Sequence, residues 1–361
     1  MVRLEKLNVG VIGAGGHGRS RHLLPYSKLA DVRLAAVADV DPNRREEAAR
    51  TFKLKAYDDY AEMLDRESLD AVSVVTPTGM HSEVASYVLR RGVHALVDKP
   101  LGASLQEALG VARAAKQSGK KLMVGFWSRF SPALAFGREY AERGLLGNAY
   151  TAYGYIVRRR GIPGIPTFID KKLSGGRGVM LDIGCYTLDS ALCLLGFRKP
   201  VSVSGATYTA FGKNPDEVKF NWGDYDPSKF ELEDYATAFV RFEGGATLLI
   251  EAGWAANVSH RGELGRLRIL GDRGGLEATG DEALREISFH SRTDNALTDT
   301  KPILRELDLG YEMVRAFVKC IRDDSSPVVS AEQSILLHSV IDGIYLSSEK
   351  GEEVKIEQAQ I

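Results

Sequence analysis

The sequence predicts an α/β protein with two domains, the first built on a parallel sheet and the second on longer, more antiparallel strands. Its 361 residues exceed the length at which one hydrophobic core usually stops growing. Up to about residue 125, short apolar runs alternate with amphipathic stretches, which is the pattern of βαβ units. Beyond that point the strand-like runs lengthen and glycine-rich turns separate them. We therefore expect domains at 1–125 and 126–361.

The first domain is expected to alternate strands with helices. Because its strand-like runs are apolar, each strand should be buried on both faces of the sheet. The predicted strands are 7–12, 32–38, 71–75, 94–97 and 121–124. The predicted helices are 18–26, 43–51, 60–64, 80–91 and 104–118.

The second domain is expected to contain a meander. Glycine-containing turns at 243–245 and 271–275 adjoin strand-like runs and predict hairpins. The stretch 211–230 predicts a long loop, and long loops often act as lids. Two helices should pack on one of the domains, and the sequence leaves open whether the second returns to the first domain. The predicted strands are 145–159, 201–210, 235–242, 246–255 and 267–270, and the helices are 311–322 and 330–348.

Composition and charge argue against several classes of protein. The 47 Lys and Arg residues nearly balance the 48 Asp and Glu residues, so no net field attracts nucleic acid or an anionic membrane. No apolar stretch approaches the roughly 20 residues that cross a bilayer. No export signal is visible, and three scattered cysteines suit neither a disulfide framework nor a cysteine zinc site. We expect a cytoplasmic protein whose partner is a small molecule.

A glycine motif follows the first predicted strand. Gly13, Gly15 and Gly18 form Gly-x-Gly-x-x-Gly, with Gly16 and His17 in the same loop and a helical pattern afterwards. The first glycine permits a tight turn, the second lets the backbone approach a pyrophosphate, and the third lets the helix pack close to the strand. The phosphates would lie at a helix N-terminus. A glycine-rich turn without a ligand is the alternative.

An acidic residue closes the second predicted strand. Asp39 lies about 20 residues after the glycine motif, where a carboxylate accepts hydrogen bonds from the adenosine ribose. It would also repel a 2′-phosphate, which favours NAD over NADP as the cofactor. Two alternatives stay open: Asp39 is an ordinary turn residue beside Asp41, or Arg44 meets the phosphate of NADP.

Asp98, Lys99 and Pro100 follow the fourth predicted strand. They would lie at the carboxyl edge of the parallel sheet, where open α/β sheets bind ligands. An ammonium group there can polarise a substrate hydroxyl and relay its proton, if burial and neighbouring charge lower its pKa. The alternative is a solvated surface lysine.

Five segments, in their order and spacing, make the chain resemble the glucose-fructose oxidoreductase, inositol dehydrogenase and rhizopine catabolism family, known as Gfo/Idh/MocA. The resemblance covers almost the whole chain. It implies a Rossmann domain followed by an α/β domain on a large, mainly antiparallel open sheet, which carries substrate on one face and often a subunit interface on the other. A homodimer or homotetramer would follow. The segments are 13–18, 76–81, 98–101, 125–130 and 175–189.

The resemblance also assigns residues to the cofactor. Lys99 matches a lysine that helps to bind substrate and cofactor, and the preceding Asp98 replaces the commoner Glu. Thr76, Pro77 and His81 match a segment that borders the nicotinamide half of the cofactor. Capping or packing at the start of a helix is the alternative for His81.

Asp182 and Tyr186 match the family's motif in the second domain, an Asp followed four residues later by a His. Tyrosine replaces the histidine here, as in some branches of the family. It can exchange a proton if the ammonium of Lys99 lowers its pKa from about 10; the alternative is that it only packs in the core. Arg129 matches an arginine at the domain junction, where it would contact substrate hydroxyls or lock the interface.

Together these residues predict a hydride transfer between a nicotinamide and a carbinol carbon of a sugar, polyol or cyclitol, with no metal. Lys99 would position the reacting hydroxyl, Tyr186 would exchange its proton, and Asp182 would orient substrate or tyrosine. The cofactor carries the hydride, while the protein supplies geometry and electrostatics. Two alternatives remain: a non-catalytic NAD-binding sensor on the same scaffold, and an enzyme that exchanges hydride between sugars through a tightly held cofactor.

Overall fold

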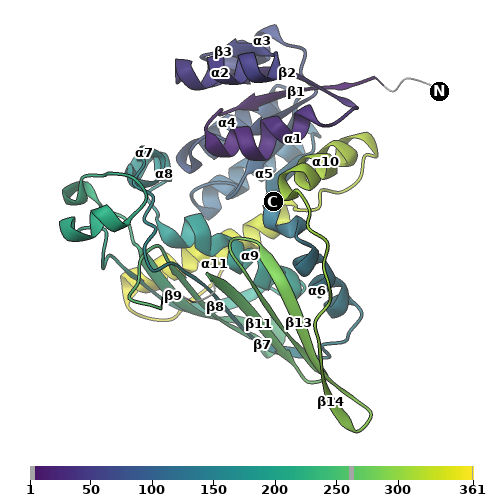
Figure 1. Cartoon of the computed structure of the whole chain (residues 1–361), viewed down its shortest axis with the longest axis vertical. Helices are drawn as coiled ribbons and strands as arrows, with labels where there is room; N and C mark the ends of the chain where they lie inside the picture. The colour runs from purple at the N-terminus through teal and green to yellow at the C-terminus, as the bar shows by residue number, and fades with distance from the viewer. Residues whose placement is uncertain (1–4, 260–263, 360) are drawn as a thin grey trace.

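The computed structural model describes residues 5–259, 264–359 and 361 of the chain. Two sheets lie at opposite ends of the molecule, and helices α9 (Cys185–Leu194), α10 (Leu309–Arg322) and α11 (Ala331–Lys350) lie between them (Figure 1). One sheet comes from the N-terminal part of the chain and the other from the part after residue 148. This arrangement confirms the predicted fold class. No helix among these residues is both long enough and apolar enough to span a membrane.

Among the described residues, six parallel strands form the first sheet in the order β3-β2-β1-β4-β5-β6. The strand order reverses at β1 and β4, and sheets of this type bind ligands at the carboxyl ends of the strands there. All residues of β4 and β6 are buried, as expected for a sheet covered on both faces. The strands are β1 (Leu7–Ile12), β2 (Val32–Ala38), β3 (Lys55–Tyr57), β4 (Ala71–Val74), β5 (His94–Asp98) and β6 (Leu122–Gly125).

The helices that connect these strands begin where the sequence offers a capping side chain. Asp41, Asp59 and Ser104 each accept hydrogen bonds from main-chain N–H groups in the first turn of the helix that follows. The expected helix after the glycine motif starts as a π-helix. The elements are η1 (Gly18–Leu23), α1 (Leu24–Ser27), α2 (Pro42–Phe52), α3 (Tyr60–Arg66), α4 (Thr78–Arg90) and α5 (Leu105–Ser118).

The second sheet has nine strands within the described ranges, in the order β14-β13-β12-β11-β7-β10-β9-β8-β15. Its paired neighbours are antiparallel apart from β7 and β10, which run parallel. Both predicted hairpins are present, β9 with β10 and β11 with β12. The strands are β7 (Ala149–Val157), β8 (Pro200–Tyr208), β9 (Tyr235–Phe242), β10 (Thr247–Gly253), β11 (Gly265–Gly271), β12 (Gly274–Gly280), β13 (Leu284–Thr293), β14 (Ala296–Thr300) and β15 (Val354–Lys355).

The last helix contacts both parts of the fold. It packs against β8 of the second sheet and against α5 beside the first. Its Asp342 accepts hydrogen bonds from the N–H of Leu105 at 3.0 Å and from Arg177 at 2.5 Å. The long helices are α6 (Pro132–Glu142), α9 (Cys185–Leu194), α10 (Leu309–Arg322) and α11 (Ala331–Lys350).

Several short helices shape the connections between these elements. The stretch 211–230, expected as a loop, contains two short 3-10 helices, η4 and η5. The short elements are η2 (Trp127–Phe130), α7 (Pro166–Ile169), α8 (Lys171–Ser174), η3 (Met180–Gly184), η4 (Pro215–Phe220), η5 (Pro227–Lys229) and η6 (Glu243–Gly245).

A buried ion pair fixes the crossover between the sheets. Arg129 lies in η2, and its guanidinium donates hydrogen bonds to both carboxylate oxygens of Asp189 in α9, with Nη2 to Oδ1 at 2.9 Å. The two side chains are 2% and 3% exposed. Gln333 of α11 lies 3.5 Å from the same guanidinium. The pair therefore joins η2, α9 and α11.

Removing one partner of this pair should destabilise the protein. We expect Arg129→Met to lower the free energy of unfolding by about 3–5 kcal/mol, because Asp189 would stay buried without its partner. Urea denaturation followed by circular dichroism measures the change. The double variant Arg129→Met/Asp189→Leu should recover much of the loss, since no unpaired charge remains. Unchanged stability of the single variant would contradict this account.

Candidate active site

The glycine loop leaves space for a ligand beside Gly15. Gly13 has a φ of 102°, and a Cβ on it would lie 2.3 Å from the carbonyl oxygen of Val75. A Cβ on Gly18 would lie 2.1 Å from the carbonyl oxygen of Gly13. By contrast, a Cβ on Gly15 would have no neighbour closer than 4.0 Å, and one on Gly16 would have none within 4 Å. The fold itself requires the first and third glycines of the motif, whereas the open space at the second is where a pyrophosphate approaches.

Asp39 and Thr76 border the same loop. The Asp39 carboxylate accepts hydrogen bonds from the N–H groups of Ala14 at 2.7 Å and Asp41 at 2.9 Å, which ties the end of β2 to the loop. The hydroxyl of Thr76 is buried and has no hydrogen-bond partner within the described part of the chain. An oriented carboxylate, an unpaired hydroxyl and an open glycine loop together fit a dinucleotide. Arg44 pairs instead with Asp41, at 3.3 Å.

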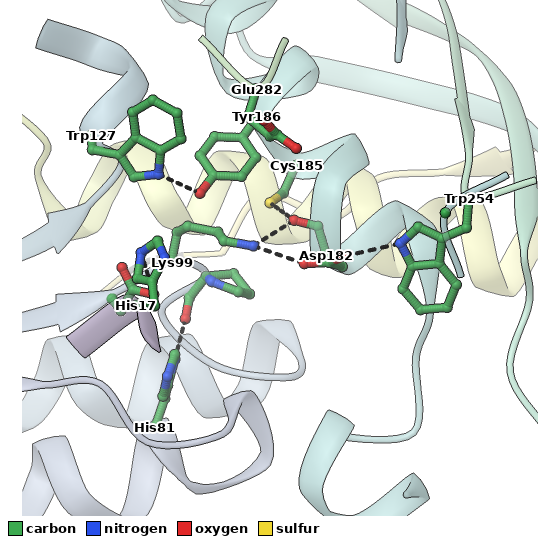
Figure 2. A network of polar contacts seen from close by, with 12 residues as sticks. His17, His81, Lys99, Trp127, Asp182, Cys185, Tyr186, Trp254 and Glu282 are labelled. Atoms are coloured by element: carbon green, nitrogen blue, oxygen red, sulfur yellow. Dashed lines mark hydrogen bonds and ion pairs between the residues drawn. The ribbon is translucent and has the colours of Figure 1, made fainter. Parts of the chain in front are cut away.

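Lys99 and Asp182 form the centre of the site (Figure 2). The Nζ of Lys99 donates hydrogen bonds to the Asp182 carbonyl oxygen at 2.6 Å and to its Oδ1 at 3.0 Å. The other carboxylate oxygen, Oδ2, accepts a hydrogen bond from Nε1 of Trp254 at 3.0 Å. Lys99 follows β5 and Asp182 lies in η3, so the contact joins the two parts of the chain.

This contact corrects the expected protonation of Lys99. Burial by itself lowers the pKa of Lys99, but the adjacent Asp182 carboxylate outweighs burial and holds that pKa well above its usual value. We expected proton relay by Lys99 only on condition that its pKa is lowered, and that condition is not met. Lys99 remains an ammonium ion, so it serves as a hydrogen-bond donor and a fixed positive charge.

Tyr186 lies beside Lys99 in the first turn of α9. The Nζ of Lys99 is 4.7 Å from the centre of the tyrosine ring. Burial raises the pKa of Tyr186 well above its usual value, although the charge of Lys99 acts in the opposite direction. We expected proton exchange by Tyr186 on condition that Lys99 lowers this pKa; the ammonium acts in that direction, but burial outweighs it. The raised pKa favours the neutral phenol, which can donate its proton.

A tryptophan orients the phenol. Nε1 of Trp127 donates a hydrogen bond to the Tyr186 hydroxyl oxygen at 2.7 Å. Because an indole N–H only donates, the Tyr186 oxygen accepts at this contact and its own proton must point elsewhere. We expected Asp182 to orient substrate or tyrosine. Within the protein its carboxylate is bonded to Lys99 and Trp254, and the orientation of substrate stays a prediction. In the structure Asp182 orients the lysine and Trp127 orients the tyrosine.

His81 supports the backbone of the site. It is buried, and its Nδ1 and Nε2 lie 2.7 Å and 2.8 Å from the carbonyl oxygens of Pro100 and Thr76. Pro77 stands immediately before α4 as its N-cap residue. Since both ring nitrogens of His81 face main-chain oxygens, the packing alternative describes it better than direct contact with the cofactor.

Asp98 points away from Lys99 toward two imidazoles. Its Oδ2 lies 3.4 Å from Nε2 of His17 in the glycine loop, and its Oδ1 lies 3.7 Å from Nε2 of His22 in η1. Burial raises the pKa of Asp98, but the two imidazoles reverse that effect and hold the pKa well below its usual range. The predicted residues Asp98 and His17 therefore lie together, with His22 as a third member.

Arg129 does not belong to this site. Its guanidinium is buried against Asp189, so it locks the junction between the two parts of the fold. Our expectation that it contacts substrate hydroxyls is corrected. The residues that sequence reasoning missed are His22, Trp127 and Trp254. Trp127 lies within the 125–130 segment already singled out, whereas Trp254, at the end of β10, carries no local signal in the sequence.

Two family models match the chain. Residues 7–126 match the NAD-binding Rossmann fold of an oxidoreductase family, and residues 137–277 match the Gfo/Idh/MocA C-terminal domain. The chain belongs to the Gfo/Idh/MocA family of oxidoreductases. The resemblance inferred from the sequence is thereby confirmed, and so is a nicotinamide cofactor for this Gfo/Idh/MocA oxidoreductase.

Relatives of this Gfo/Idh/MocA oxidoreductase include named sugar dehydrogenases. D-glucoside 3-dehydrogenase of Escherichia coli (strain K12) is 28% identical over 354 residues, which cover 97% of each chain. D-xylose 1-dehydrogenase (NADP(+)) 2 of Haloferax volcanii is 26% identical over 356 residues, covering 96% of this chain and 99% of that protein. The solved structure of levoglucosan dehydrogenase in complex with NADH and levoglucosan matches 98% of this chain and 100% of its own, with a TM-score of 0.85. Its 22% identity makes this a similarity of fold.

Two glycine substitutions should separate folding from cofactor binding in this Gfo/Idh/MocA oxidoreductase. Gly18→Ala forces a Cβ against backbone and should lower the free energy of unfolding by about 1–3 kcal/mol. Gly15→Ala has room in the protein, so we expect unchanged thermal stability but NAD+ binding weakened at least about tenfold. Thermal denaturation and NAD+ titration calorimetry measure the two effects. If Gly15→Ala binds NAD+ normally, the open space at Gly15 does not hold the pyrophosphate.

Proposed function

We propose that this oxidoreductase transfers a hydride between NAD and a carbinol carbon of a sugar, polyol or cyclitol. The observation that carries the proposal is the grouping of Lys99, Asp182 and Tyr186 next to the glycine loop. Asp98, which precedes Lys99, lies 3.4 Å from His17 of that loop, so the group stands where the cofactor would end. The names of the relatives described above support the substrate class.

Lys99 would bind and polarise the reacting hydroxyl. An ammonium has three N–H donors, and the two hydrogen bonds to Asp182 leave one donor for a substrate oxygen. Asp182 and Trp254 hold the ammonium in place, so little reorganisation is needed when substrate binds. When bound, the nicotinamide accepts or supplies the hydride.

Tyr186 would hold and move the proton. In the reducing direction its neutral hydroxyl donates a proton to the developing alkoxide oxygen, and in the oxidising direction its oxygen takes that proton back. The phenolate formed during reduction lies beside the Lys99 ammonium and accepts the Trp127 N–H. Both contacts stabilise the negative charge at the moment it appears.

The first test combines a substrate panel with substitutions. Absorbance of the reduced nicotinamide is followed with NAD+ and NADP+ over aldoses, glucosides, inositols and vicinal diols. We expect Tyr186→Phe to lower kcat by about 10²–10⁴-fold, the usual contribution of general acid–base catalysis, and Lys99→Met to lower kcat/KM at least as much. Tyr140→Phe is the matched control, because its ring packs on Phe289 between α6 and β13.

Each other outcome has a defined meaning. Turnover that survives Tyr186→Phe would remove Tyr186 from proton transfer. Tight NAD+ binding without turnover on any substrate would favour a non-catalytic sensor. Nicotinamide that stays with the protein through purification and is reduced by one sugar and oxidised by another would favour exchange between sugars.

We also propose that NAD is preferred over NADP. The Asp39 carboxylate is held at the carboxyl end of β2 by two main-chain N–H groups, in a position to accept the ribose hydroxyls and repel a 2′-phosphate. Arg44, whose side chain is about half exposed, is the nearby cation that a 2′-phosphate would need.

Replacing Asp39 should therefore change cofactor preference. We expect Asp39→Ser to raise kcat/KM for NADP+ relative to NAD+ by about tenfold or more, equivalent to roughly 1.4 kcal/mol. Initial rates with both cofactors measure the ratio, and Arg44→Ala in the same background should reverse the gain. A wild-type enzyme that prefers NADP+ would overturn the proposal.

The oligomeric state, the cellular location and the class of partner are inferred from the sheet surface, the cysteines and the charge balance. The outward face of the second sheet carries Tyr153, Phe239 and Leu249, so we propose that this face joins subunits in a homodimer or homotetramer. We propose a cytoplasmic location, since all three cysteines are free thiols. The near balance of acidic and basic residues favours a small-molecule partner over nucleic acid.

A further inference from the structure

A second group of polar side chains lies behind the catalytic lysine. His17 comes from the glycine loop, His22 from η1 and Asp98 from the end of β5. In Figure 2 the His17 and Asp182 side chains are drawn at opposite ends of the Lys99 side chain. His22 and Asp98 are buried, while the His17 side chain is 39% exposed.

These three residues carry buried polar atoms that lie at ion-pair distance from one another but form no hydrogen bond within the described residues. Nε2 of His17, both ring nitrogens of His22 and Oδ1 of Asp98 are buried without a hydrogen-bond partner in the described part of the chain. Buried polar groups are nearly always paired, so each exception calls for an explanation. Here these atoms lie close together, because the Asp98 carboxylate is 3.4 Å from Nε2 of His17 and 3.7 Å from Nε2 of His22.

The group is unusual within this molecule. Over the described residues, it is the one set of three or more His, Cys, Asp or Glu side chains whose ligand atoms all lie within 4.8 Å of one another. His338 is also buried with both ring nitrogens unpaired, yet it belongs to no such set. Burial of a histidine alone therefore does not account for the convergence.

We propose that His17, His22 and Asp98 bind a divalent transition-metal ion, for which zinc is the best fit. Two imidazole nitrogens and one carboxylate oxygen suit Zn²⁺, and three protein ligands leave the fourth position for water.

The spacing of the ligand atoms suits this ion. Tetrahedral zinc with bonds of about 2.1 Å places its ligand atoms about 3.4 Å apart. The two separations between His and Asp, 3.4 Å and 3.7 Å, are already near that value. The two imidazoles must approach each other, and rotation of the partly exposed His17 ring provides the movement.

The ion would act on structure rather than on the reacting hydroxyl. Nζ of Lys99 is directed at Asp182, whereas the Asp98 carboxylate lies beside the two imidazoles. Zinc bound there would tie the glycine loop and η1 to the end of β5. This inference is independent of the substrate and of the direction of hydride transfer.

Metal binding to the purified full chain, without a polyhistidine tag, tests the proposal. After removal of metal with a chelator, Co²⁺ is titrated as a spectroscopic probe and then displaced by Zn²⁺. We expect one equivalent of Co²⁺ with the intense visible bands of a tetrahedral site, and full displacement by zinc. Because loss of an outer-shell partner alone weakens metal binding 10–100-fold, His17→Ala and Asp98→Asn should each weaken zinc binding by about 100-fold or more.

A matched control keeps the result specific. His290 lies 2.7 Å from Asp299 in the exposed hairpin of β13 and β14, so His290→Ala removes a surface His–Asp pair and should leave the stoichiometry unchanged. Circular dichroism shows whether each variant is folded. If the Asp98→Asn variant does not fold, the test depends on His17→Ala, because the His17 side chain is partly exposed. No stoichiometric binding, or cobalt bands that persist in folded His17→Ala, would overturn the proposal. Loss of binding in His290→Ala would do so as well.

Discussion

The candidate site depends on one buried contact, the pairing of the Lys99 ammonium with Asp182. The lysine follows the fifth strand of the parallel sheet, and the aspartate lies in the π-helix that leads into α9. Their side chains are only 10% and 14% exposed, so neither charge is stable there without the other. Neither part of the fold can assemble the site alone, and the relative position of the two sheets is fixed at the point where substrate would bind.

This pairing also sets the electrical balance around Tyr186. The ammonium is neutralised by one carboxylate, and the phenol beside it is kept neutral by burial. The Lys99–Asp182 pair therefore has no net charge. The Lys99 ammonium and the Trp127 N–H are placed to stabilise a negative charge on the Tyr186 oxygen when it forms. Trp127 and Trp254 place indole N–H donors on opposite sides of the lysine, one at the phenol and one at the carboxylate (Figure 2). The phenol and the carboxylate are thus each held by a rigid aromatic side chain.

Local pattern accounts for much of this architecture, and contacts between distant segments account for what was missed. The glycine motif and the five apolar runs were sufficient to predict most of the parallel sheet. The strand β3 was not predicted because it has three residues and is largely exposed. Helix α9 was not predicted as an element because all ten of its residues are buried, which removes the polar face that reveals a helix.

The protonation states could not be predicted from sequence because they depend on burial and on partners far along the chain. Lys99 and Tyr186 were identified correctly as candidates by their motifs, but the direction of each pKa shift depends on how deeply the group lies and on which charge is nearest. The hydrogen bond from Trp127 to Tyr186 likewise joins residues that are neighbours only after both sheets have formed.

The position of β7 in the second sheet has a consequence for the order of folding. This strand lies between two meanders, β8-β9-β10 and β11-β12-β13-β14, and both meanders follow it in the chain. On a ribosome, β7 emerges before either neighbour exists and must wait, unpaired, until the two meanders close around it; such distant strand pairing makes for slow folding.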